Sequence, residues 1–170
     1  MAGTLRALLL ETTEHGPREP GWPTVPLAAG RGLVLLPLTE EIVARLVPGT
    51  ADDVPVDGFY DLTSGIAEWA RRLSADGVVA YVHSEFFGGS GFQAAVAWRD
   101  GVTAWGPLFT ATSDGEAEDH YVTVPGMRAM ALNVLLRWWG VRPMNGADEF
   151  AAAGLDRFRW TEEWAAQAEN

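Results

Sequence analysis

The chain has 170 residues, of which 48% are hydrophobic and 21% are charged, a balance typical of one folded domain rather than of a disordered chain. It contains no cysteine and no lysine, which excludes disulfides, thiolate ligands, lysine Schiff bases and a phosphate-loop lysine. The net charge of −11 disfavours binding to nucleic acid or to anionic membranes, because both depend on basic residues.

The first half of the chain predicts two strands and two helices. Residues 5–12 and 32–38 are short apolar runs typical of buried strands, and an irregular arm with four prolines joins them over residues 14–31. A threonine followed by two acids predicts the start of a helix over residues 39–47. Apolar residues at helical spacing predict a second helix over residues 64–74.

Three strands are predicted next, over residues 78–87, 92–99 and 102–109. Asp100-Gly101 joins the last two, and this dipeptide is the preferred two-residue turn of a β-hairpin. We therefore expect an antiparallel meander, with a further short strand over residues 121–124.

The remainder of the chain predicts helices. Residues 127–139 are apolar over more than half of the helix circumference, so this helix should be the one most deeply packed on the sheet. The tail over residues 142–170 predicts two short helices, near residues 148–153 and 162–168. Together the elements predict a single α+β domain spanning residues 1–170, in which helices pack on one face of an antiparallel meander of about four to six strands.

The turn Phe87-Gly88-Gly89-Ser90-Gly91 has the glycine content of a phosphate-binding loop. Such loops lead into a helix, whose free N–H groups hold the anion. Here the turn leads into the strand that begins at Phe92, so the glycines are better explained by backbone conformations that a turn requires.

Polar residues beside this turn are the best candidates for a site. His83 and Glu85 are two residues apart on a strand and share a face, so they could transfer a proton or bind a metal. A third ligand is missing nearby; His120 or an acid from residues 114–119 would have to supply it. The alternative is a structural hydrogen-bond pair at the sheet rim, which we favour. The candidate ligand or partner residues are Glu85, Gln93, His83, Phe86, Phe87 and Phe92.

No other pattern predicts an enzyme. The three histidines have no metal-binding spacing, the serines include no nucleophile elbow, and no carboxylate pair is specific for glycoside chemistry. The sequence therefore assigns no catalytic residue, no metal and no cofactor, and it favours a non-catalytic protein.

The stretch Tyr81 to Trp98 resembles a hairpin found in a loosely defined group of uncharacterised bacterial proteins. Their pattern is an acid, two aromatics, Gly-Gly-x-Gly-x-Gln, and a strand of small residues that ends in Trp. Gly106-Pro107-Leu108 and Trp138-Trp139-Gly140-Val141 match later parts of that pattern, with Trp-Gly-Val in place of Leu-Gly-Val, so that the resemblance covers about residues 78–141. Some of these proteins resemble immunity proteins of bacterial toxin systems in their genomic setting.

The leading hypothesis is therefore an acidic, immunity-like or accessory protein that binds a basic protein partner. Its acidic surface would comprise Asp52, Asp53, Asp114, Glu116, Glu118 and Asp119. The alternative is a small-molecule-binding protein or enzyme with a pocket near Glu85 and Gln93, and a homo-oligomer paired through a sheet edge is a third possibility. Arginine in place of lysine indicates a high-GC bacterial genome, and the lack of a signal-peptide or membrane-span pattern predicts a cytoplasmic protein.

Overall fold

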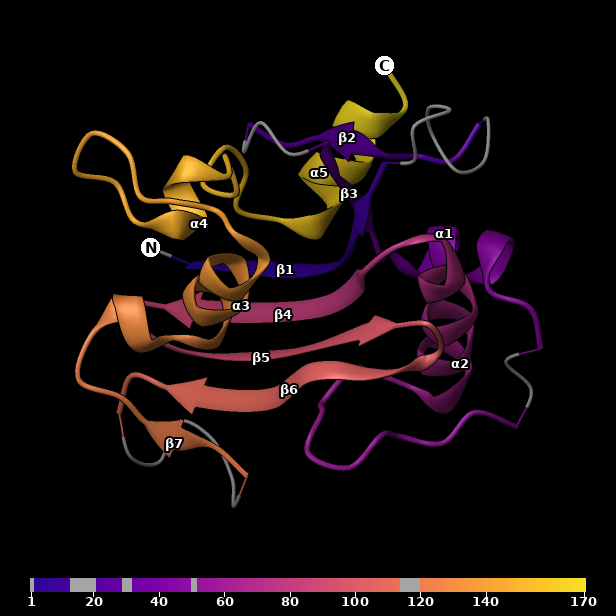
Figure 1. The fold of residues 1–170 in the computed structure, drawn as a ribbon, viewed down its shortest axis with the longest axis horizontal. Helices are drawn as coiled ribbons and strands as arrows, with labels where there is room; N and C mark the ends of the chain where they lie inside the picture. The colour runs from indigo at the N-terminus through magenta and orange to yellow at the C-terminus, as the bar shows by residue number, and fades with distance from the viewer. Residues whose placement is uncertain (1, 13–20, 29–31, 50–51, 114–119) are drawn as a thin grey trace.

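A computed structural model describes residues 2–12, 21–28, 32–49, 52–113 and 120–170. They form an α+β fold around one seven-stranded sheet in the order β2-β3-β1-β4-β5-β6-β7 (Figure 1). The strands are β1 (Ala2–Glu11), β2 (Val25–Pro26), β3 (Leu33–Pro37), β4 (Val79–Phe87), β5 (Ser90–Arg99), β6 (Val102–Ala111) and β7 (Val122–Thr123). All neighbours pair antiparallel except β6 and β7, which are parallel.

The predicted meander is confirmed in β4, β5 and β6. Asp100 and Gly101 both have positive φ, at 52° and 78°, as the predicted two-residue turn requires. The turn between β4 and β5 is equally tight, because Phe87 pairs with Ser90 and leaves only Gly88 and Gly89 in the loop. Their φ values of 59° and 90° confirm that these two glycines serve the geometry of the turn.

In the part of the chain that the structure describes, five α-helices accompany the sheet: α1 (Glu40–Leu46), α2 (Ser64–Leu73), α3 (Ala131–Trp139), α4 (Glu149–Ala152) and α5 (Thr161–Ala168). Among the described residues, the short 3₁₀ helices η2 (Ser74–Asp76) and η3 (Met127–Ala129) precede β4 and α3. Within the described residues, no helix has the length and apolar character needed to cross a bilayer.

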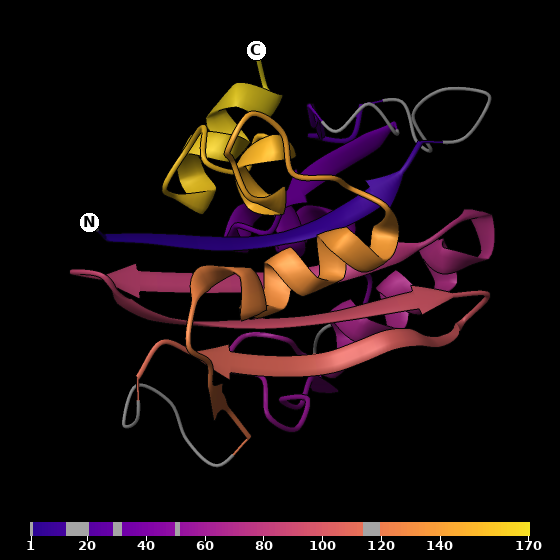
Figure 2. The same cartoon turned by 60° about the vertical axis from the view of Figure 1, so that its left-hand side comes forward.

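Helices cover both faces of the sheet, whereas the sequence predicted one. Along β1 the side chains alternate, so that Leu9 joins a core cluster with α3 and α5, while Leu8 joins a separate cluster with α1 and α2. Figure 2 shows α3 in front of the sheet and α2 behind it. The run of buried leucines in β1 explains why both faces are covered, because a strand without polar alternation is buried on both faces.

The main helix is shorter than the predicted helix over residues 127–139. Residues 127–129 form η3, Met130 is extended with ψ of 148°, and α3 begins at Ala131. Two strand side chains hold this start: Thr110 Oγ1 accepts a hydrogen bond from the Ala131 N–H, and Gln93 Oε1 accepts one from the Leu132 N–H, each at 2.9 Å. The helix begins where the sheet supplies caps for its free N–H groups.

Candidate functional site

The β4–β5 hairpin divides the predicted site residues between the two faces of the sheet. Glu85 pairs across the strands with Phe92, and Ser84 pairs with Gln93. Because directly opposed residues share a face and successive residues alternate, Glu85 and Gln93 lie on opposite faces. The predicted common pocket for these two residues is therefore wrong, and each face has to be considered by itself.

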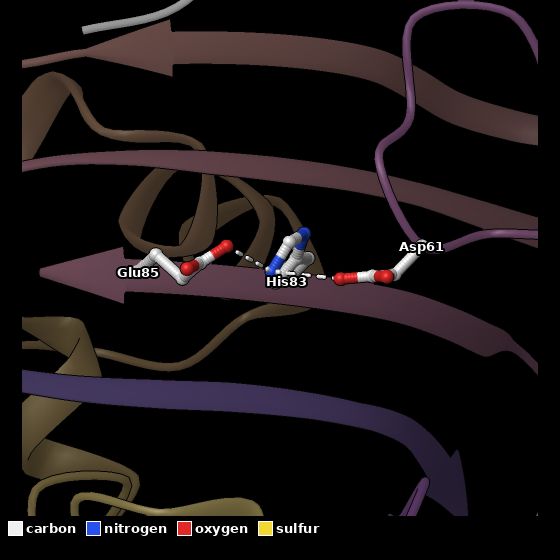
Figure 3. Close-up of side chains that lie close together, drawn as sticks. All are labelled: Asp61, His83 and Glu85. Atoms are coloured by element: carbon white, nitrogen blue, oxygen red, sulfur yellow. Dashed lines mark ion pairs between the residues drawn. The ribbon is translucent and has the colours of Figure 1, made fainter. Parts of the chain in front are cut away.

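On the face covered by α1 and α2, His83 lies between two carboxylates (Figure 3). His83 Nε2 is 3.0 Å from Glu85 Oε2 and 3.5 Å from Asp61 Oδ2. The imidazole is fully buried, while the Glu85 and Asp61 side chains are 25% and 39% exposed. The third group, which could not be identified from the sequence, is thus Asp61. His120 lies elsewhere, with Nε2 3.3 Å from Asp57 Oδ2.

Asp61 reaches this place because the segment before α2 is anchored by its apolar neighbours. Phe59 is 7% exposed, and its ring packs edge-on against Tyr81 and Phe109, with ring centroids 5.7 and 4.8 Å apart. Leu62, on the other side of Asp61, is 1% exposed. Burial of these two flanking side chains holds the carboxylate beside His83 of β4.

Arg6 supports Asp61 from the neighbouring strand. It lies opposite His83 in the β1–β4 register, and its Nη1 is 3.4 Å from Asp61 Oδ1. The guanidinium therefore contacts one carboxylate oxygen, while the other oxygen, Oδ2, faces His83. This division of the two oxygens fixes the orientation of the carboxylate.

The charges of the cluster fit a neutral imidazole. Burial lowers the pKa of His83 to about 4, although the Asp61 carboxylate opposes that shift and Arg6 adds to it. Burial also raises the pKa of Glu85 above its ordinary value, with a further contribution from Asp61 against the opposing effect of Arg6. A neutral imidazole has a lone pair available on one ring nitrogen.

Neither ring nitrogen of His83 has a hydrogen-bond partner among the described residues. Nε2 lies close to both carboxylates, yet neither contact has the geometry of a hydrogen bond. An orphaned polar group in the core costs about 1–3 kcal/mol, so native structures rarely retain one. A structural hydrogen-bond pair at the rim, the interpretation favoured from the sequence, does not account for this arrangement.

The spacing of the three groups instead fits the ligands of one ion. For bonds of about 2.1 Å, ligand atoms lie about 3.0 Å apart at a right angle and about 3.4 Å apart at the tetrahedral angle. The two distances from His83 Nε2, 3.0 and 3.5 Å, match these values, and all three ligand atoms lie within 4.8 Å of one another. Imidazole nitrogen with carboxylate oxygen is a donor set for a divalent transition metal.

A cavity of about 370 Å³ adjoins the cluster, and Asp61, Arg6, Tyr60 and Tyr81 contribute to its lining. The Tyr81 hydroxyl is fully buried and has no hydrogen-bond partner among the described residues. Burial raises the pKa of Tyr81 above its ordinary value, so the phenol keeps its proton.

Aromatic rings enclose the cluster on its other side. Phe92 packs edge-on against the His83 ring, with centroids 5.4 Å apart. Tyr60 packs at a tilt against Phe92 at 5.0 Å, and Tyr121 packs edge-on against it at 5.4 Å. Phe92 is therefore the one predicted aromatic that contacts the cluster. These rings separate His83 from bulk water.

On the opposite face, Gln93 has a structural role that the sequence did not indicate. Its amide connects Ser84 with the start of α3, because Nε2 donates to Ser84 Oγ at 3.2 Å and Oε1 accepts from the Leu132 N–H. Phe86 lies on this face as well, and Phe87, at the end of the strand, is 61% exposed. The opposite placement of residues 85 and 93 could have been predicted from the sequence, because a two-residue turn at Gly88-Gly89 puts them on different faces of the sheet.

The predicted acidic partner surface is only partly within the described residues. Asp114, Glu116, Glu118 and Asp119 lie outside them, so the binding of a basic partner stays a prediction. Asp53 has a local role at the start of α2, where Oδ1 accepts from the Gly65 N–H at 2.7 Å and Oδ2 from the Thr63 hydroxyl at 3.1 Å.

Comparison with known proteins adds no relative: the chain matches no protein-family model, no curated protein and no solved structure.

Proposed function

We propose that this protein binds a divalent transition-metal ion through Asp61 Oδ2, His83 Nε2 and Glu85 Oε2. The observation that carries the proposal is the buried imidazole, whose Nε2 lies 3.0 and 3.5 Å from two carboxylate oxygens without a hydrogen bond to either. An ion at the centre of the three groups would satisfy the nitrogen lone pair and both carboxylates at once.

The surroundings support such an ion. The two carboxylates and Arg6 carry a net charge of −1 around a neutral imidazole, so a divalent cation would be stabilised electrostatically. Arg6 contacts Oδ1 of Asp61, the oxygen that does not face His83, and so would act as the partner that orients a ligating carboxylate.

Three protein ligands leave at least one coordination position open on an ion such as Zn²⁺. Zinc sites with three protein ligands keep the fourth position for water or a substrate. Because Asp61 is both a ligand of the cluster and part of the cavity lining, that position would be reached from the cavity of about 370 Å³. The proposed function is therefore metal-dependent binding of a small molecule in this cavity.

The test is metal binding by the full chain and by two matched asparagine variants. After treatment with a chelator, calorimetric titration with Zn²⁺ and with Mn²⁺ should show one equivalent bound to the wild type. Asp61→Asn removes one charged ligand and should lower the affinity at least about tenfold. Asp57→Asn is the control, because the Asp57 side chain is 93% exposed and pairs with His120, away from the cluster.

Thermal unfolding provides the second measurement. Metal at one hundred times its Kd should raise the stability of the wild type and of Asp57→Asn by about 2.7 kcal/mol. Asp61→Asn and Glu85→Gln should gain less from the same concentration. A wild type without one bound equivalent, or equal affinities in the two asparagine variants, would contradict the proposal.

A further inference from the structure

A second cavity lies on the other face of the same hairpin, away from the metal cluster. It encloses about 460 Å³ and is walled chiefly by apolar side chains, among them Leu5, Phe86, Phe150 and Phe158. Figure 2 shows how α3 and the C-terminal helices gather over this face of the sheet, and the cavity lies among β1, β4, η3 and the segment after α4. Its size falls within the range of small-molecule sites.

Two buried polar side chains, Ser84 and Gln93, also belong to the lining. They are 5% and 2% exposed, and they are joined by the bond from Gln93 Nε2 to Ser84 Oγ. A serine hydroxyl carries one proton and a glutamine amide carries two. Within the described residues, the Ser84 proton and the second Gln93 amide proton have no acceptor, so both remain available to a ligand.

The charges at this cavity argue for a neutral ligand. Arg159 and Asp156 are both exposed and both contribute to its lining, which therefore carries one charge of each sign. The other lining residues that the structure describes have uncharged side chains. A lining with no net charge favours neither a cation nor an anion, whereas an apolar body would contact aromatic walls.

We propose that this cavity binds a small neutral molecule with an aromatic or aliphatic body and one acceptor oxygen, such as a carbonyl. The apolar body lies against Phe86, Phe150 and Phe158. The oxygen accepts hydrogen bonds from the Ser84 hydroxyl and the Gln93 amide at the buried polar part of the wall. This site is independent of the metal cluster, because it lies on the opposite face of the sheet.

Benzamide and toluene are suitable probes, because they share a ring and differ in the acceptor group. Binding of each to the full chain is measured by NMR titration. The wild type should bind both, and benzamide more tightly. Ser84→Ala should weaken benzamide binding by about three- to tenfold, the worth of one hydrogen bond, and leave toluene binding unchanged.

A filling variant tests the location. Met127 contributes to the lining and is 46% exposed, so Met127→Trp should occupy the cavity without disturbing the core, and it should abolish binding of both probes. Met144→Trp is the control, because Met144 is 62% exposed and lies outside the lining; it should bind like the wild type. Failure of the wild type to bind either probe, or full binding by Met127→Trp, would overturn the proposal. Equal losses of both probes in Ser84→Ala would overturn the assigned acceptor contact.

Discussion

Replacing Gln93 with methionine should destabilise the fold although it changes the side-chain volume little. The substitution removes the acceptor of the Leu132 N–H, a group in a residue with no exposed surface, and also the donor to Ser84. An orphaned buried N–H costs about 1–3 kcal/mol, and the lost bond to Ser84 adds about 0.5–1.5 kcal/mol. Because methionine fills a similar volume, no cavity term is added, and we expect a total loss of about 2–4 kcal/mol.

Urea unfolding and thermal unfolding both measure this loss. The entropy of unfolding is about 2.1 cal/mol/K per residue, so the Tm of the 170-residue chain should fall by about 6–11 °C. Gln167→Met is the control, because Gln167 is exposed on α5, and its effect should stay within about 0.5 kcal/mol. If Gln93→Met loses no more stability than the control, the assignment of Gln93 as the cap of α3 is refuted.

Two further predictions concern buried hydrogen bonds. Burial raises the pKa of Glu149, but hydrogen bonds from Arg137, from its own backbone N–H and from Arg128 outweigh this, so its pKa lies below the ordinary value. Glu149→Gln should therefore lose about 1–3 kcal/mol at pH 7, a deficit that is complete above pH of about 4.3 and shrinks as the pH falls toward the lowered folded pKa. Urea unfolding at several pH values measures it, and a deficit that grows in acid would contradict the reasoning. Trp139→Phe removes the indole N–H that donates to Glu11 Oε1 at 2.7 Å and should cost about 1–3 kcal/mol in urea unfolding. The equivalent change at the neighbouring Trp138, which is 38% exposed, should cost less; equal losses would contradict the assignment.

Local signals were sufficient to predict most elements of the fold. Thr39 caps α1 as expected, accepting from the Ile42 N–H at 3.2 Å, and Asp100-Gly101 forms the turn that the dipeptide predicts. These features depend on residues that are neighbours in the chain, so a single sequence contains them. The start of α3 was predicted too early, because its caps come from Gln93 and Thr110 on distant strands.

The candidate site could be predicted only in part, because one of its three residues comes from a distant segment of the chain. The sequence placed His83 and Glu85 on one face by strand alternation, which needs only local information. Asp61 lies in an irregular segment whose position depends on the packing of Phe59 against Tyr81 and Phe109. No periodicity in the sequence indicates that contact, so the third group of the cluster can be identified only from the folded structure.

The alternation along β4 constrains how this protein can change in evolution. Tyr81, His83 and Glu85 serve one face, whereas Ser84 and Phe86 serve the other. Inserting or deleting one residue within this strand would turn the side chains on one side of the change to the opposite face and so disrupt both candidate sites. Length variation among descendants of this sequence should therefore accumulate in loops, while the number of residues between Val79 and the glycine turn stays constant.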